Sequence, residues 1–311
     1  MRIAVTGATG FLGRSLLQLL SADGHTLVAW ARSPESASRH DFSVGVEWRY
    51  GQLGSAEDAA ALVRDCDAIV HAGLVRPTGS FLDSGTEPLD YWHRNVTGSL
   101  QLLEASKSAR LRRFIFVSSG AVHDRVIDGL PLNESHPHRP ATLYGAYKAA
   151  VESLVHHYGT ANSGTANFSA ATEMVTATVR PPVIYGINEP IESSRWYELV
   201  RRICLGENVH AVNGSKCVHV EDLARSIAIL LGSDGVESGS TYNCCDRMIS
   251  EFEVAELAKS FSNSDAQITG APKVAKNEII TERIQSLGMK FGGTPLLKAT
   301  IGRMVRQVLS L

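Results

Sequence analysis

Thr6-Gly-Ala-Thr-Gly-Phe-Leu-Gly13 follows the short apolar run Arg2-Ile-Ala-Val5 and precedes the helical pattern Arg14-Ser-Leu-Leu-Gln-Leu-Leu20. Spaced glycines between a buried strand and a helix are typical of a turn that binds the pyrophosphate of a dinucleotide. The phosphates would meet the free N–H groups and the positive dipole end of that helix. The alternative is a glycine-rich turn that holds no ligand.

Each glycine of this turn has its own predicted task. Gly7 allows the tight turn, Gly10 lets the backbone approach the pyrophosphate, and Gly13 permits close packing of helix on strand. The residues predicted to contact the cofactor here are Gly7, Thr9, Gly10, Phe11, Leu12 and Gly13.

Downstream of the turn, short β-rich runs alternate with helical patterns. Strands are predicted at 26–30, 46–50, 68–71, 113–117 and 175–179, and helices near 14–22, 56–64 and 89–109. This alternation predicts an α/β fold, a Rossmann-like doubly wound parallel sheet with helices on both faces. Ligands in that architecture lie at the carboxyl ends of the strands, where Arg32, Leu53, Ala72-Gly73 and Ser118-Ser119 fall.

The rest of the chain is predicted to be mostly helical, with few strands. A helix runs from Tyr144 to about 157, a mobile loop of small polar residues covers 159–173, and further helices follow at 193–205, 221–232, 250–262 and 296–309. We expect a dinucleotide-binding domain at 1–179, to which 214–243 returns, and a smaller C-terminal substrate domain made of 180–213 and 244–311.

Bulk composition indicates an ordinary globular protein. The 311 residues are 44% hydrophobic and 20% charged, and the net charge of -2 leaves no broad electrostatic surface for nucleic acid or anionic membrane. Five scattered cysteines form neither a disulfide framework nor a metal-ligand spacing, and the histidines form no zinc pattern. With no leader at the start and no apolar stretch near about 18 residues, we expect a cytoplasmic protein without a metal site.

Tyr144 and Lys148 stand four residues apart in a predicted helix, so they share one face. Alone, a tyrosine there is more often a packing residue, as Tyr147 is expected to be, and a lysine is more often a solvated charge. Their joint occurrence after Ser119 and behind a dinucleotide turn favours proton chemistry at a substrate oxygen.

Together these segments resemble the extended short-chain dehydrogenase/reductase superfamily, in its epimerase/dehydratase branch, over residues 1 to about 245. The segments that carry the resemblance are Thr6 to Gly13, Val70-His-Ala-Gly73, Asn95-Val-Thr-Gly98, Val117-Ser-Ser119, Tyr144 with Lys148, Arg180-Pro-Pro-Val-Ile-Tyr-Gly186 and Val218-His-Val-Glu-Asp-Leu-Ala224.

The resemblance implies roles for the predicted catalytic residues. Tyr144 would exchange a proton with the substrate oxygen while hydride moves between the substrate carbon and the nicotinamide. Lys148, with an oxidised nicotinamide, would lower the pKa of Tyr144 from about 10, and would hold the nicotinamide ribose. Ser119, chosen over Ser118 because it directly precedes Gly120, would hydrogen-bond the same substrate oxygen. Asn95 would support the site from a helix.

The cofactor is predicted to be NADP(H) in preference to NAD(H). Ala31-Arg32-Ser33 ends the second strand without the carboxylate that usually binds the ribose hydroxyls, and the Arg32 guanidinium suits a 2′-phosphate. The alternatives are that Arg32 stacks on adenine or faces water. The resemblance adds Gln52 and Leu53 at the adenine, and Ala72, Gly73, Pro181 and Val183 along the rest of the cofactor.

The substrate is less well defined. Relatives that act on nucleotide sugars usually carry an asparagine where Pro182-Val183 stands and an arginine near Lys216, which weakens that interpretation. Three functions stay open: a carbonyl or keto-sugar reductase, a nucleotide-sugar epimerase or dehydratase that retains its cofactor, and a redox sensor without turnover. Candidate substrate contacts, chosen by position, are Val75, Arg76, Ala121, His123, Val183, Tyr185, Arg195 and Trp196. Helices 89–109 and 144–157 could pair two subunits as a homodimer.

Overall fold

The structure of the protein is a computed structural model that describes residues 1–38, 45–76, 87–160 and 174–310. Its centre is a seven-stranded sheet in which every neighbouring pair of strands is parallel. In spatial order the strands are β10 (Ser240–Asn243), β6 (Val175–Arg180), β5 (Arg113–Val117), β4 (Ala68–His71), β1 (Arg2–Thr6), β2 (Thr26–Ala31) and β3 (Val46–Tyr50). The chain order reverses between β1 and β4, which is the crevice where dinucleotides bind in such sheets.

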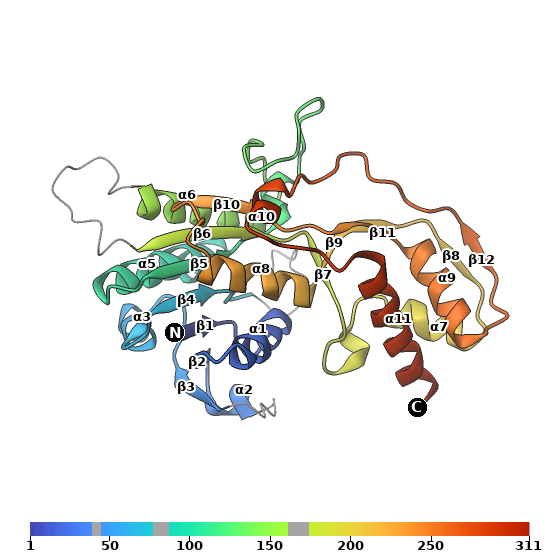
Figure 1. Cartoon of the computed structure of the whole chain (residues 1–311), viewed down its shortest axis with the longest axis horizontal. Helices are drawn as coiled ribbons and strands as arrows, with labels where there is room; N and C mark the ends of the chain where they lie inside the picture. Colours follow the sequence, from blue (N-terminus) through green and yellow to red (C-terminus); the bar gives the residue numbers. More distant parts are fainter. Residues whose placement is uncertain (39–44, 77–86, 161–173, 311) are drawn as a thin grey trace.

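Helices cover both faces of this sheet (Figure 1). One layer holds α1 (Phe11–Ala22) and α8 (Val220–Gly232); the other holds α3 (Ala56–Val63), α5 (Gly98–Ser108) and α6 (Leu143–Thr160). Neighbouring residues of one strand belong to opposite layers: Ile3 and Val5 pack with α1 and α8, whereas Ala4 packs with α3 and α5. The predicted doubly wound α/β sheet is therefore confirmed.

The predicted helix at 89–109 is made of three joined segments. These are α4 (Pro88–Trp92), the π-helical η1 (His93–Thr97) and α5. Hydrophobic periodicity cannot distinguish an α-turn from a π-turn, because the two differ only in which carbonyl accepts each hydrogen bond. Some short helices of the described ranges were not predicted: α2 (Pro34–Ser38), α10 (Glu282–Ser286) and the 3-10 helices η2 (Gly120–His123) and η4 (Ile191–Ser193).

The C-terminal part, which lies to the right of the sheet in Figure 1, packs around a core of its own. Its helices are α7 (Tyr197–Cys204), α9 (Glu251–Ser262) and α11 (Gly293–Leu309), and α10 (Glu282–Ser286) lies near β10. The expectation of few strands is wrong. A three-stranded sheet joins β7 (Val183–Tyr185), β9 (Gly214–His219) and β11 (Arg247–Ser250), and β8 (Val209–Ala211) pairs with β12 (Ile268–Gly270). Strands this short contain too few residues to show a legible alternation.

The segment 214–243 is expected from the sequence to return to the dinucleotide-binding domain. Its helix α8 packs on the large sheet and its strand β10 is an edge strand of that sheet, whereas its strand β9 belongs to the three-stranded sheet. The division into two domains stays a prediction. Most of the predicted loop at 159–173 lies outside the described residues. Within the described ranges, no single helix is both long enough and apolar enough to span a membrane.

Candidate active site

The glycine turn leaves no room for side chains at two of its three glycines. Gly7 has a φ of +70°, and a Cβ atom there would lie 2.7 Å from the Ala72 carbonyl oxygen. A Cβ atom at Gly13 would lie 2.2 Å from the Gly7 oxygen. The turn is therefore pressed against the Ala72-Gly73 segment after β4, so the predicted contact residues of both segments lie together.

The start of α1 fits the phosphates of a dinucleotide. Gly10 is the N-cap residue, and it has no side chain to cap the first turn of the helix. The N–H groups of Phe11, Leu12 and Gly13 begin this turn, and backbone N–H groups at such a position bind anions. The residues present are thus suited to the cofactor that the sequence predicts.

A chain of buried hydrogen bonds links the glycine turn and the segment after β4 to the helical segment that contains Asn95 and Ser99. The Gly73 N–H donates to the Thr6 hydroxyl (2.8 Å), which lies 2.8 Å from His71 Nδ1. His71 Nε2 lies 2.8 Å from the Ser99 hydroxyl, and that hydroxyl donates to the Asn95 carbonyl oxygen. Since Ser99 uses its proton on Asn95, it must accept from His71, which places the His71 proton on Nε2. Burial, with a smaller effect of Lys148, lowers the pKa of His71 to about 3.

Asn95 is fully buried within the π-helical segment. Its side chain accepts from the Val75 N–H (2.9 Å) and donates to the carbonyl oxygens of Val75 (2.8 Å) and Tyr91 (2.9 Å). It therefore fixes the segment after β4, where Val75 and Arg76 are candidate substrate contacts. The sequence singled out Asn95 but gave His71 no role of its own, because the hydrogen-bond partners Thr6 and Ser99 are far from His71 in the chain.

The predicted adenosine contacts lie at the ends of β2 and β3. Arg32 is exposed, directly after β2, and within the described ranges it has no hydrogen bond or ion pair. Gln52 and Leu53 line a pocket of about 140 Å³ together with Gly54, Asp90, His93 and Arg94. His93 and Arg94, which the sequence did not single out, therefore lie beside the predicted adenine contacts Gln52 and Leu53.

Ser119, Tyr144 and Lys148 come together at the carboxyl end of β5. Ser119 lies close enough to the Tyr144 hydroxyl to lower its pKa, although Ser119 follows β5 and Tyr144 is in the first turn of α6. Lys148 Nζ donates to the Val117 carbonyl oxygen (2.7 Å) and to the Tyr147 hydroxyl (3.2 Å), and lies 5.7 Å from the centre of the Tyr144 ring.

The two proton-active side chains are shifted toward their neutral forms. Burial raises the pKa of Tyr144, and the interaction with Ser119 offsets part of this rise. Burial lowers the pKa of Lys148 to about 7, against an opposing effect of Glu152. Burial dominates in the protein chain itself, whereas the predicted lowering of the Tyr144 pKa concerns a site that also holds an oxidised nicotinamide. The protein chain by itself therefore holds Tyr144 as a phenol, the acid form.

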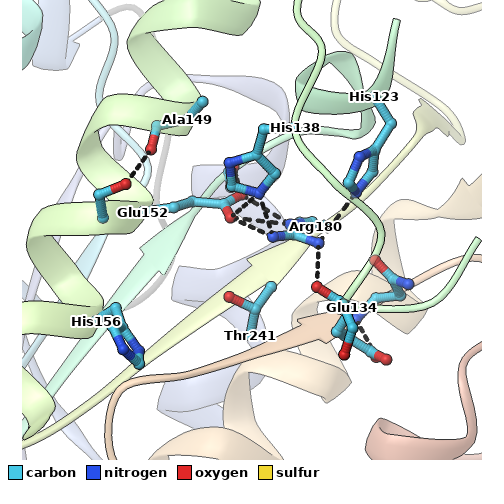
Figure 2. A network of polar contacts seen from close by, with 12 residues as sticks. His123, Glu134, His138, Ala149, Glu152, His156, Arg180 and Thr241 are labelled. Carbon is cyan, nitrogen blue, oxygen red and sulfur yellow. Dashed lines mark hydrogen bonds and ion pairs between the residues drawn. The ribbon is translucent and has the colours of Figure 1, made fainter. Parts of the chain in front are cut away.

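Ser118 is occupied elsewhere. Its hydroxyl donates to the Glu152 carboxylate, which also forms a buried ion pair with Arg180 at 2.6 Å. Figure 2 shows Arg180 between Glu152 and the rings of His138 and His123. Of the two neighbouring serines, only Ser119 faces Tyr144, which supports the choice made from the sequence. Pro181 follows Arg180 and accepts from the Gly120 N–H (2.8 Å), so this cofactor candidate lies beside Ser119.

The candidate substrate contacts fall into two groups. Ala121 and His123 lie in η2, next to Ser119, but both ring nitrogens of His123 hydrogen-bond within the chain. Tyr185 and Trp196 pack against each other in the C-terminal core with ring centres 5.4 Å apart, and the Arg195 guanidinium lies 5.2 Å from the Trp196 ring. Val183 pairs with Cys217 in the three-stranded sheet. Across the described ranges, no three His, Cys, Asp or Glu side chains form a metal site.

Comparison with known proteins gives one family and two kinds of relative. The model of the NAD dependent epimerase/dehydratase family matches residues 3–245. A 4-hydroxy-2-methyl-3-oxo-4-farnesyl-3,4-dihydroquinoline-1-oxide ketoreductase from Stigmatella aurantiaca is 34% identical over 194 residues, covering 61% of this chain and 52% of that protein. A UDP-glucose 4-epimerase from Azospirillum brasilense is 32% identical over 166 residues, covering 52% and 45%. The chain thus spans about half the length of these relatives.

Solved structures share the whole fold. MoeE5 in complex with UDP-glucuronic acid and NAD superposes with a TM-score of 0.76 at 22% identity, over 100% of both chains. The UDP-glucose 4-epimerase of Thermus thermophilus in complex with NAD gives 0.75 at 21% identity, over 98% of this chain and 99% of that one. At this identity the likeness concerns the fold alone.

Proposed function

The chain belongs to the NAD-dependent epimerase/dehydratase family of extended short-chain dehydrogenases/reductases, and on that premise we propose that it is an NADP(H)-dependent oxidoreductase interconverting a secondary alcohol and a ketone. The observation that carries this proposal is the position of Ser119 near the Tyr144 hydroxyl, with Lys148 Nζ 5.7 Å from the centre of the Tyr144 ring. Two hydroxyl groups that converge at the carboxyl end of a parallel strand can both reach one substrate oxygen.

Each side chain of the site has a different role toward the substrate oxygen. When bound, the nicotinamide supplies or accepts the hydride. In the direction of reduction, Tyr144 donates its phenolic proton to the substrate carbonyl oxygen and becomes a phenolate. Ser119 donates a hydrogen bond to the same oxygen and orients it, and Lys148 stabilises the phenolate. Because burial keeps Tyr144 protonated, the resting site already holds the proton that reduction needs.

Reduction is also favoured by three observations outside the proton-transfer site. Arg32 stands exposed where a carboxylate would select NAD(H), so we assign NADP(H), the cofactor whose 2′-phosphate a guanidinium can bind. Among the relatives, a ketoreductase and a 2-alkyl-3-oxoalkanoate reductase from Shewanella oneidensis are named for carbonyl reduction. Val183 and Lys216 replace residues that usually bind the diphosphate of nucleotide sugars.

A nucleotide-sugar epimerase or dehydratase that retains its cofactor is the second candidate. It is supported by several UDP-glucose 4-epimerases among the relatives. A redox sensor without turnover is the third candidate, which the presence of both Tyr144 and Lys148 disfavours. The cytoplasmic location and the homodimer through 89–109 and 144–157 remain predictions.

The decisive experiment compares cofactor consumption with cofactor retention. The purified protein is incubated with NADPH or NADH and a panel of ketones and UDP-sugars. A reductase consumes NADPH in proportion to the ketone reduced, which lowers the absorbance band of reduced nicotinamide. An epimerase is purified with bound cofactor and converts a sugar without net change in that band.

The Tyr144→Phe variant tests the acid/base role directly. It keeps the ring and removes the proton, so we expect turnover to fall by about 10² to 10⁴-fold. Its affinity for NADPH, measured by fluorescence, should stay within about twofold of the unaltered protein. Full turnover in this variant would rule out the proposed chemistry.

A further inference from the structure

Arg180 is a buried cation whose hydrogen-bonding capacity is completely used. The guanidinium has five N–H groups, and its Nε donates to both Glu152 oxygens (2.9 and 3.0 Å). Nη2 donates to Glu152 Oε2 (2.6 Å) and lies 2.7 Å from His138 Nε2. Nη1 donates to the Glu134 carbonyl oxygen (3.2 Å) and lies 3.1 Å from His123 Nε2. Figure 2 shows these partners on all sides of the guanidinium.

The chemistry of arginine decides the protonation of both histidines. A guanidinium has donors and no acceptor, so a ring nitrogen at hydrogen-bond distance from it must be unprotonated. Nε2 of His123 and of His138 are therefore acceptors. His123 carries its proton on Nδ1, which donates to the Pro137 carbonyl oxygen at 3.3 Å. His138 Nε2 also lies 3.3 Å from Glu152 Oε2, but a proton on Nε2 would face the Arg180 N–H group across 2.7 Å.

Each partner in this cluster is close in the chain to a residue of the proposed active site. Glu152 lies on α6, one turn after Lys148 and two turns after Tyr144. Ser118, which donates to Glu152, directly precedes Ser119. Arg180 directly precedes Pro181, whose carbonyl oxygen accepts from the Gly120 N–H. The cluster thus joins α6, the end of β5 and the end of β6, the elements that carry the acid/base residues.

We propose that Arg180 is a positioning residue, completed by His138 and His123 as neutral Nδ1–H tautomers, that holds α6 against β5 so that Tyr144 meets Ser119. The role rests on the proposed function, since it concerns the geometry of that site. Removing one acceptor leaves a buried donor of a cation without a partner, which displaces the guanidinium and loosens the helix that it anchors.

The tautomers are tested without any substrate. Two-dimensional NMR of protein with ¹⁵N-labelled histidine at pH 7 distinguishes rings protonated at Nδ1 from rings protonated at Nε2, and single His→Gln variants assign the signals. We expect His123 and His138 to be neutral with the proton on Nδ1. A proton on Nε2 in either ring would overturn the proposal.

The positioning role is tested with a matched set of variants. His138→Phe removes the acceptor, His138→Gln keeps an oxygen acceptor, and His157→Phe alters an exposed histidine of α6, the helix that the cluster anchors. With ¹³Cζ-labelled tyrosine, the Tyr144 signal is the one that disappears in Tyr144→Phe. We expect this signal to shift in His138→Phe, to return in His138→Gln and to stay unchanged in His157→Phe. An unchanged Tyr144 signal in His138→Phe, or an equal shift in the control, would contradict the proposal.

Kinetics separate positioning from binding. With a panel compound that the unaltered protein turns over, kcat should fall about tenfold in His138→Phe while KM for NADPH stays within about twofold. A fall that His138→Gln fails to restore would point to simple destabilisation and overturn the proposal. Full turnover in Tyr144→Phe would instead defeat the proposed function, so the two failures are distinguishable.

Discussion

At the scale of single residues, the protonation states of Tyr144 and Lys148 set the direction in which the site is prepared to work. Burial favours the neutral form of each, so the site at rest holds a phenol and a partly deprotonated amine. A buried phenol is a ready acid and a poor base. Oxidation of an alcohol would need the phenolate, and hence an added positive charge beside Tyr144.

Arg32 is the residue on which the proposed choice of NADP(H) over NAD(H) rests. The Arg32→Asp variant replaces a guanidinium that can bind a 2′-phosphate with a carboxylate that can bind the ribose hydroxyls. We expect the ratio of affinities for NADPH and NADH to shift toward NADH by about 10 to 100-fold, the equivalent of one charged hydrogen bond. Arg112→Asp, an exposed arginine just before β5, is the control and should leave the ratio unchanged. Unaltered selectivity in Arg32→Asp would show that Arg32 does not contact the 2′-phosphate.

Gly13 shows how closely the start of α1 packs against the backbone of the glycine turn. An added methyl group would lie 2.2 Å from the Gly7 oxygen and 2.7 Å from the Ala8 Cα atom, so Gly13→Ala must displace α1 from β1. We expect the free energy of unfolding to drop by about 1 to 3 kcal/mol, together with a marked loss of NADPH affinity. Gly232→Ala at the end of α8, where no atom lies within 4 Å of the added Cβ, should change neither. Urea titration and fluorescence binding measure both, and wild-type affinity in Gly13→Ala would contradict the assignment of the turn.

At the scale of elements, the end of β5 assigns different tasks to two adjacent serines. Strand geometry turns neighbouring side chains to opposite faces, so Ser118 reaches Glu152 on α6 while Ser119 reaches Tyr144. One serine therefore stabilises the contact between β5 and α6, and the other is left for the substrate.

Alanine at each serine should separate these tasks. Ser119→Ala should lower kcat by about 10² to 10³-fold, as the loss of an oxyanion donor does, with little change in stability. Ser118→Ala should lower the free energy of unfolding by about 1.5 to 3 kcal/mol, because a charged carboxylate loses a buried donor, with a smaller effect on kcat. Thermal denaturation and steady-state kinetics measure the two effects, and the reverse pattern would show that Ser118 is the serine that contacts the substrate.

At the scale of the whole molecule, buried neutral histidines make the fold sensitive to acid. Burial lowers the pKa of His71 to about 3, and of His123 and His219 to about 4. Because the unfolded chain binds protons near pH 6.5 and the folded chain does not, stability is highest above that pH and falls as the pH decreases toward 4. Each histidine contributes a slope of up to roughly 1.4 kcal/mol per pH unit.

Glu152 extends this dependence to lower pH. Burial raises the pKa of Glu152, but the hydrogen bonds and charge of Arg180, with the hydrogen bond from Ser118, outweigh burial and lower this pKa to about 2. Its contribution is present above pH 4.5 and is lost as the pH falls toward 2. Urea unfolding should show little change in stability between pH 8 and about pH 6.5, and an increasing loss from there to pH 4. His157→Asn, at an exposed site, should keep the slope of the unaltered protein, and a flat profile would show that the three histidines are protonated in the folded state.

The sequence by itself determined the strands β1 to β6 of the large sheet and the candidate residues of the site. Hydrophobic periodicity and glycine spacing are local properties, so they located β1, the turn at Gly7 to Gly13 and the alternation that produces a parallel sheet. The spacing of Tyr144 and Lys148 is also local, because a helix places such residues on one face.

The tertiary structure decided what depends on segments that are far apart in the chain. The meeting of Ser119 with Tyr144, the enclosure of Arg180 by Glu152, His138 and His123, and the pairing of β9 with β7 and β11 are all of this kind. The upward shift in the pKa of Tyr144 belongs here too, because burial is produced by packing of the whole chain. Local sequence patterns specify which atoms are available, and long-range packing specifies which of them touch and how much water reaches them.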